Sequence, residues 1–169
     1  MPIPKAESHV IVYRDGDYAV AQHGETREVI ASSTDHASVI QAAVNAVQNG
    51  GGGVVFIRKG EYTLSSTISV GIGVYIVGES SETYNATHIK AQAGLAIAFS
   101  FDGESELGYH RGGGISRLYI SGQQEDGSVG ILVKHFLWFY IDNVQIWGFD
   151  TNIKIEDNYG CVITRCRIS

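Results

Sequence analysis

Apolar and polar residues alternate through residues 10–31 of the chain. A period of two is typical of β-strands, and Asp15-Gly16 and His23-Gly24 supply turn residues between the runs. The pattern predicts a small β-meander. We interpret it as an N-terminal leader, residues 1–33, that lies outside the core.

The period changes to three and four residues in the segment that follows. Thr34 or Asp35 can cap the start of a helix here, and Gly50 can cap its end. The pattern predicts an amphipathic helix over about residues 35–49, which we group with the glycines after it as a capping unit, residues 34–53. One face of this helix carries its apolar side chains, Val39, Ile40, Ala43, Val44 and Val47.

Short apolar runs separated by turn residues follow, and they predict strands over residues 54–57, 62–70, 74–77, 88–91 and 95–101. From Gly130 the pattern repeats, because residues 130–147 align with residues 152–169 at a shift of 22 positions without a gap. An earlier copy begins at Ile115 and aligns with the segment from Ile141. The aligned apolar pairs are Ile131 with Ile153, Val133 with Ile155, Ile141 with Ile163, Val144 with Cys166, and Ile146 with Ile168.

A repeat of this length, with alternation inside each short strand, is what one coil of a parallel β-helix needs. We therefore assign residues 54–169 to such coils, with these apolar pairs pointing inward. Because residues 167–169 still read as a strand, we expect the coils to continue beyond Ser169, or a partner subunit, as in a homotrimer, to cover that end.

Four glycines, residues 50–53, precede the first predicted strand. A Walker-type phosphate loop needs Lys and then Ser or Thr directly after its last glycine, and a dinucleotide fingerprint follows a strand and opens a helix. Here a helix comes first and a strand follows, so no helix N-terminus is available for a phosphate. We interpret the glycines as a sharp turn that lets the helix cover the open end of the first coil.

Composition narrows the possible functions of this chain of 169 residues. It has 18% charged residues, 21 Gly and 2 Pro, which suits one all-β domain with many turns. A net charge of -6 and the lack of a basic stripe argue against nucleic acid as a partner. The start of the chain lacks a signal-peptide pattern and no run is long enough for a membrane span, so we expect no membrane partner.

The chain has two cysteines, Cys161 and Cys166, and neither their number nor their spacing fits a zinc site. We interpret both as small core residues, although a disulfide between them is possible in an oxidising compartment. Cys166 replaces Val144 in the repeat. It is therefore predicted to be a buried free thiol.

Residues 35–80 resemble the N-terminal cap of the right-handed parallel β-helix proteins of the pectate-lyase-like superfamily. The segments that carry the resemblance are Ile40-Gln41-Ala42-Ala43-Val44, Gly52-Gly53-Val54-Val55, Lys59-Gly60-Glu61-Tyr62 and Val77-Gly78-Glu79, which match an AIQxAI helix, a GGxVxxPxGxY turn and an xLxGEG strand. The resemblance covers the chain from about Asp35 onward. It implies an all-β fold, a right-handed parallel β-helix (solenoid) with an N-terminal amphipathic capping helix after the short β-meander leader. The same cap precedes lyases, glycoside hydrolases, epimerases, tailspikes and adhesins, so it does not specify a function.

The resemblance also implies where chemistry would lie, because active members carry acidic or basic residues along an outer strand face. The Asn-Thr-Asp, Asp-Asp and Arg-x-Lys motifs of polygalacturonase-like hydrolases do not occur, and we interpret Asp150-Thr151-Asn152 as a loop turn. The late carboxylates do not stack into the calcium-binding column of the lyases. We expect no complete catalytic set and no cofactor in this chain, with calcium possible if the whole protein is a lyase. The carboxylates in question are Asp142, Asp150, Glu156 and Asp157.

The repeat places Tyr119, Gln145 and Arg167 in one outward row with Trp147 near its edge. Aromatic and polar side chains in a shallow row suit stacking and hydrogen bonding to sugars, although an ordinary solvated face would look the same. The run from Phe136 to Tyr140 is too long for alternation to bury. We expect part of it, with Trp138 and Tyr140 as candidate rings, to be exposed as an interface, a sugar platform or a surface covered by another segment.

Further charged residues have simpler interpretations. Lys134 above Glu156 and His135 above Asp157 pair opposite charges across coils. His110 and Arg111 lie in a glycine-rich segment that we interpret as a loop.

The sequence thus favours the N-terminal part of a polysaccharide lyase or glycoside hydrolase, whose partner is a polysaccharide or glycan. A non-catalytic β-helix such as a stalk, tailspike or surface adhesin is the alternative. We expect such a protein outside the cell, on a cell surface or on a virion.

Overall fold

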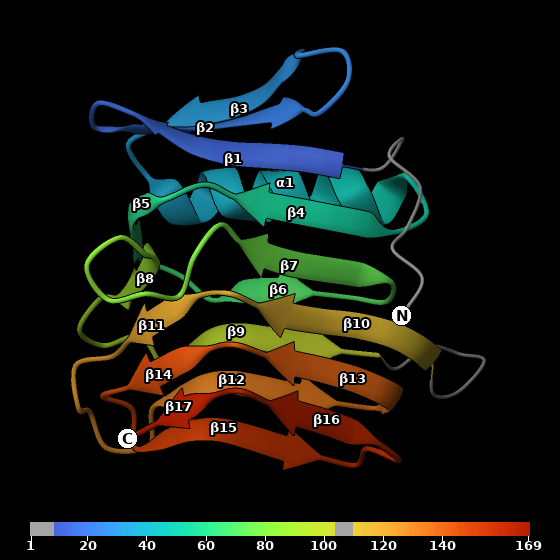
Figure 1. Ribbon diagram of the computed structural model, residues 1–169, viewed down its shortest axis with the longest axis vertical. Coiled ribbons are helices and arrows are strands. Elements are labelled where there is room, and N and C mark those ends of the chain that lie inside the picture. The colour runs from blue at the N-terminus through green and yellow to red at the C-terminus, as the bar shows by residue number, and fades with distance from the viewer. Residues whose placement is uncertain (1–8, 104–109) are drawn as a thin grey trace.

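The structure is a computed structural model that describes residues 9–103 and 110–169. These residues form seventeen strands and one α-helix, and most strands pair in parallel. Figure 1 shows the strands stacked along the long axis of the molecule, with β1–β3 at one end and β15–β17 at the other. The prediction of a mostly β chain is confirmed.

The strands form three sheets, which we call A, B and C. Sheet A contains, in spatial order, β16 (Cys161–Thr164), β13 (Phe136–Asp142), β10 (His110–Ser116), β7 (Val74–Gly78), β4 (Gly53–Ile57), β1 (His9–Asp15), β2 (Tyr18–His23) and β3 (Val29–Ser33). Sheet B contains β17 (Arg167–Ile168), β14 (Gln145–Trp147), β11 (Tyr119–Ser121), β8 (Thr87–Ala91) and β5 (Gly60–Leu64). Sheet C contains β15 (Thr151–Glu156), β12 (Val129–Lys134), β9 (Ile97–Asp102) and β6 (Ile68–Val70).

From β4 onward the chain enters sheets A, B and C in turn and then returns to sheet A one strand further along. Each new strand pairs in parallel with the strand that preceded it in the same sheet. The register confirms the predicted alignment at a shift of 22 positions. The Cα partners include Ile131 with Ile153, Val133 with Ile155, Ile141 with Ile163, and Ile146 with Ile168.

The core lies between the three sheets and is built from the inward side chains of each strand. Ile131, Val133, Val144 and Ile146 are buried, as predicted. Their partners in the last strands are not: Ile153 and Cys166 are half-buried, while Ile155 and Ile168 are exposed. The burial of these residues is incomplete because no described strand lies on the far side of β15–β17 to cover them.

The helix α1 (His36–Asn49) buries the apolar face that the sequence predicts, and it ends at Gly50. Its side chains bond the outer edges of the first strands of sheets B and C. His36 Nδ1 accepts a 3.0 Å hydrogen bond from the Thr63 amide, and Gln48 Oε1 accepts one of 3.2 Å from the Gly71 amide. These hydrogen bonds show how the helix caps the sheets: they pair strand edges that would otherwise be open.

The glycines after α1 make the predicted turn into β4. Gly51, Gly52 and Gly53 all have positive φ, a conformation that side chains disfavour. A Cβ on Gly52 would also lie 2.8 Å from the carbonyl oxygen of Gly73. Glycine is therefore needed here both for the turn and for close packing of the neighbouring loop.

The β-meander is confirmed, since β1, β2 and β3 pair antiparallel in sequence order. The prediction that this meander lies outside the core is wrong. β1 also pairs in parallel with β4 and so extends sheet A, and Val10, Val12, Ala19 and Ala21 belong to the buried core. The first eight residues of the predicted leader lie outside the described residues.

Two further predictions of local structure need correction. The predicted strand over residues 62–70 is divided into β5 and β6, because residues 65–67 turn the chain from sheet B to sheet C. The glycine-rich segment expected to be a loop is the strand β10, which begins at His110. The side chains of His110 and Arg111 lie outside the described residues.

The described part of the chain contains no helix with the length and apolar character needed to cross a bilayer.

Candidate functional site

The five parallel strands of sheet B place one outward side chain each at the same register position. The resulting row, which we call the sheet B row, consists of Glu61, His88, Tyr119, Gln145 and Arg167. Alternation within each strand explains the arrangement, since the intervening residues, such as Ile120 and Ile146, are buried. The predicted row of Tyr119, Gln145 and Arg167 is thus brought together by the fold.

Two members of the sheet B row, Glu61 and His88, were missed by the sequence reasoning. The loops between the early strands differ in length from those of the later repeat. A fixed shift of 22 positions therefore does not align Glu61 and His88 with the later members of the row. The alternation in Thr87–Ala91 was the available signal, because it makes Ile89 an inward residue like Ile120 and leaves His88 outward.

A shallow depression of about 270 Å³ lies at the later end of the row. Tyr119, Gln145, Trp147 and Arg167 line it, together with Thr83 from the loop before β8. The indole Nε1 of Trp147 donates a 2.6 Å hydrogen bond to the Tyr119 hydroxyl oxygen. Thr83 Oγ1 donates one of 3.3 Å to the side-chain oxygen of Gln145. The aromatic and amide side chains are therefore held in place before any ligand binds.

His88 continues the row next to Tyr119, and the two ring centroids are 4.4 Å apart. Its Nε2 lies 2.8 Å from Ser121 Oγ, and its Nδ1 lies 3.6 Å from a carboxylate oxygen of Glu61. Burial lowers the pKa of His88, and this effect outweighs the opposing charge of Glu61. The imidazole is therefore neutral at pH 7. Glu61 is instead paired with the ammonium group of Lys90 at 3.2 Å.

The depression combines features that suit an acidic sugar. Trp147 and Tyr119 offer ring surface against which a pyranose can stack, and the Gln145 amide can hydrogen-bond sugar hydroxyls. The exposed guanidinium of Arg167 can bind a carboxylate with two parallel hydrogen bonds.

The other two candidate rings, Trp138 and Tyr140, lie on a different face. Both belong to β13 in sheet A, so the structure does not bring them to the sheet B row. Trp138 is 47% exposed, which confirms that part of the aromatic run is not buried. Tyr140 lines a separate groove on the outer face of sheet A, with Tyr75 and Gly114.

The outer face of sheet C carries charged residues in pairs. Lys134 Nζ lies 2.7 Å from a carboxylate oxygen of Glu156, which confirms the predicted pair, and Lys154 Nζ lies 2.6 Å from the other oxygen. Hydrogen bonds from the two lysines lower the pKa of Glu156 to about 2. His135 Nδ1 lies 2.8 Å from Asp102, a contact that the sequence did not predict.

These carboxylates do not fit a calcium site. Glu156 is already neutralised by two lysines, and Asp142 accepts hydrogen bonds from Arg165 and Thr164. Among the described residues there is no group of three or more His, Cys, Asp or Glu side chains arranged to hold a metal ion.

Comparison with known proteins gives one informative similarity. No family model matches the chain. In an alignment of 135 residues that covers 73% of this chain, it is 34% identical to "Alginate lyase 7" of Azotobacter vinelandii. The matched segment is 14% of the length of that protein. The chain is thus similar to a small part of a much longer polysaccharide lyase.

Proposed function

We propose that this chain is the N-terminal part of a parallel β-helix protein that interacts with carbohydrate and is of a polysaccharide-processing type, a lyase or a glycoside hydrolase. The regular passage of the chain through three sheets and the helix that pairs the first strand edges support the β-helix interpretation. The similarity to an alginate lyase supports a polysaccharide as the ligand, and a lyase before a hydrolase.

The single observation that carries the proposal is the depression on sheet B, where Trp147 and Tyr119 are hydrogen-bonded beside Gln145 and Arg167. Holding the rings in advance lowers the entropy cost of binding a sugar. Arg167 favours an acidic polysaccharide, and alginate is a polymer of uronic acids, each with one carboxylate. We propose that uronate units of such a polymer bind in this depression.

Titration with alginate oligosaccharides, followed by calorimetry and tryptophan fluorescence, tests this site. Trp147→Ala and Arg167→Gln are each expected to weaken binding about tenfold, the effect of losing one stacked ring or one charged hydrogen-bond pair. Tyr18→Ala and Arg27→Gln are matched controls, because both residues are exposed and lie in the meander, away from sheet B. Equal affinity of all four variants would contradict the proposal.

A non-catalytic β-helix, such as a stalk, tailspike or adhesin, is the second candidate. It is favoured by the pairing of the late carboxylates Asp142 and Glu156 with cations, which leaves them poorly suited to acid or base catalysis. The candidates differ in their products. A lyase of the complete protein would release oligosaccharides with an unsaturated sugar at one end, whereas a structural β-helix would bind the polymer and leave its length unchanged.

The exposed apolar side chains on the last strands motivate a proposal about partners. Ile155, Ile163 and Ile168, one on each of β15, β16 and β17, are each at least 41% exposed. We propose that further coils or the other subunits of a homotrimer cover them. Sedimentation velocity of the 169-residue chain distinguishes the two, since a homotrimer predicts a threefold mass. We propose that the complete protein acts outside the cell or at a surface, which secretion assays of the full gene product would test.

A further inference from the structure

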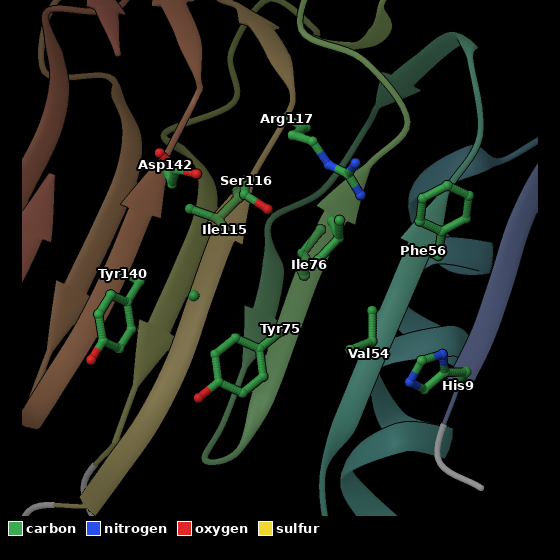
Figure 2. A pocket seen from close by; sticks show the side chains of 12 residues that line it. His9, Val54, Phe56, Tyr75, Ile76, Ile115, Ser116, Arg117, Tyr140 and Asp142 are labelled. Carbon is green, nitrogen blue, oxygen red and sulfur yellow. The ribbon is translucent and has the colours of Figure 1, made fainter. Parts of the chain in front are cut away.

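The outer face of sheet A contains a groove of about 310 Å³, well separated in the fold from the sheet B row. Tyr75, Gly114 and Tyr140 occupy one register position on three adjacent strands, β7, β10 and β13. Figure 2 shows the two tyrosine rings on either side of β10 with their hydroxyl groups pointing the same way. The groove exists because the middle strand has no side chain between them.

The sequence of β10 maintains this gap at a cost, because glycine weakens the interior of a strand. A Cβ on Gly114 would lie 2.9 Å from the carbonyl oxygen of Tyr140 and 3.2 Å from Cδ1 of Tyr75. Gly112 has a φ of +91°, and a Cβ there would lie 3.1 Å from the Tyr75 hydroxyl oxygen. The glycines therefore let the Tyr75 ring lie against β10, where it forms a wall of the groove.

The remaining lining makes the groove amphipathic. Phe56 adds a third aromatic ring. Burial, and then the neighbouring hydroxyl of Tyr140, raise the pKa of Tyr75, so its phenol remains a hydrogen-bond donor at neutral pH. Rings with polar tips around a small hollow suit the alternating C–H and hydroxyl surfaces of a pyranose. At about 310 Å³ the groove is at the small end of ligand sites, which fits a short stretch of sugar units.

Charge at one end of the groove indicates the kind of sugar. In Figure 2 the Arg117 side chain extends toward the Phe56 side of the groove, away from Asp142. Its guanidinium donates no hydrogen bond to any described residue. The hydrogen bond from Arg165 is the main cause of the lowered pKa of Asp142, and the charge of Arg117 adds a smaller effect. That carboxylate is held directly by Arg165 and Thr164. Arg117 therefore keeps its donors available for an incoming carboxylate.

His9 supplies an unpaired group on the β4 side of the groove, next to Val54. Its Nε2 is buried and has no hydrogen-bond partner among the described residues. Buried polar atoms without partners are uncommon and call for an explanation. Because this nitrogen is closed off from solvent, a sugar hydroxyl would bond it only after the His9 side chain turns toward the groove.

We infer that the sheet A groove is a second glycan-binding site, in which a uronate carboxylate binds Arg117 and pyranose rings pack against Tyr75 and Tyr140. The choice of an acidic glycan rests on the proposed function, whereas the site itself is separate from the sheet B row. A polymer bound along both faces would be held at two points of the same molecule, which increases avidity without new contacts at either site.

The test uses backbone amide NMR of the 169-residue chain with alginate oligosaccharides and with their carboxyl-reduced, neutral counterparts. Gly114 and Ile115 report on the groove, and Gln145 and Ile146 report on the depression of sheet B. Shifts at Gly114 and Ile115 that saturate with the acidic oligosaccharides and are at least tenfold weaker with the neutral ones are expected. Shifts confined to Gln145 and Ile146 would overturn the second site and leave the proposed function standing. Shifts confined to Gly114 and Ile115 would support the second site and contradict the proposed site on sheet B.

Variants identify the residues responsible. Arg117 has a φ of +54°, so Arg117→Asn removes the charge with a residue that tolerates this backbone, and about a tenfold loss of affinity in the groove is expected. Arg27→Asn is the matched control, since Arg27 is an exposed arginine with a φ of +63°. Tyr140→Leu is expected to weaken groove binding similarly, with Tyr18→Leu in the exposed meander as its control. Unchanged groove affinity in Arg117→Asn, a surface substitution, would overturn the inference even if the tyrosine variant unfolds. The inference would also be overturned if neutral oligosaccharides or an apolar peptide bound in the groove as tightly as the acidic oligosaccharides.

Discussion

The side-chain amide of Gln41 makes the two hydrogen bonds that a neighbouring strand would make to Ser69. Gln41 Oε1 accepts from the Ser69 amide at 2.8 Å, and Gln41 Nε2 donates to the Ser69 carbonyl oxygen at 2.9 Å. Ser69 is in the middle of β6, the first strand of sheet C. A helix residue thereby substitutes for a strand, which closes an edge that would otherwise be free to pair with another chain.

Replacing Gln41 should open this edge. Gln41→Ala is expected to lower the free energy of unfolding by about 1–2 kcal/mol, the usual range for two partly exposed hydrogen bonds, and to promote aggregation through β6. Denaturant unfolding and light scattering would measure both. Asn49→Ala, at the exposed end of the same helix, is the control. If the two variants unfold and aggregate alike, the pairing by Gln41 contributes nothing.

Glu156 should remain ionised far into acid. Hydrogen bonds from Lys134 and Lys154 lower its pKa from an ordinary 4.5 to about 2. A lowered folded-state pKa means that the stabilisation is present above about pH 4.5 and is lost as the pH falls through about 2. NMR titration of the Glu156 carboxyl carbon would show the midpoint, and Lys134→Met should raise it toward 4.5 while Lys59→Met leaves it in place. A wild-type midpoint near 4.5 would contradict the role of the lysines.

Cys161 and Cys166 should react slowly with thiol reagents. Both are free and half-buried, and Cys166 Sγ lies 3.1 Å from the Thr164 carbonyl oxygen. Burial raises the pKa of Cys161 from 9.0 to about 11 and also raises the pKa of Cys166. At neutral pH the thiolate fraction of Cys161 should be about a hundredfold below that of an ordinary cysteine, because each pKa unit is a factor of ten. Alkylation followed by mass spectrometry should give fast labelling only after denaturation, and fast labelling of the native chain would refute this. The predicted free thiol at Cys166 is confirmed, but its complete burial is wrong.

The 169-residue chain should not cleave polysaccharides by itself. The expected motifs are absent from the sequence, and the late carboxylates Asp142 and Glu156 are paired with cations. Incubation with acidic and neutral polysaccharides, with and without calcium, should give no new unsaturated or reducing ends above a boiled control. Product formation would show that the 169-residue chain contains a complete catalytic set. Product formation that is lost in a His88→Gln variant would locate that set in the sheet B row.

Local periodicity was sufficient to predict much of this protein. The spacing of apolar residues in α1, such as Ile40 and Val44, marks a helix because one helical turn brings them to one face. The shift of 22 positions predicted that Ile131 lies beside Ile153, because residues equivalent in a repeat must pair when copies stack. The outward row of Tyr119, Gln145 and Arg167 followed from the same register.

The tertiary structure decided what depends on contacts between segments of unrelated spacing. Loops of different length precede β8, so only the folded chain shows that the His88 ring packs against Tyr119. The glycines of β10 suggested a loop, but pairing with β7 and β13 on both sides supplies the hydrogen bonds that make them a strand. The groove at Gly114 exists only because Tyr75 and Tyr140, which are 65 positions apart, occupy neighbouring strands. A sequence pattern encodes which face a residue takes, whereas the partner across that face is set by how the whole chain packs.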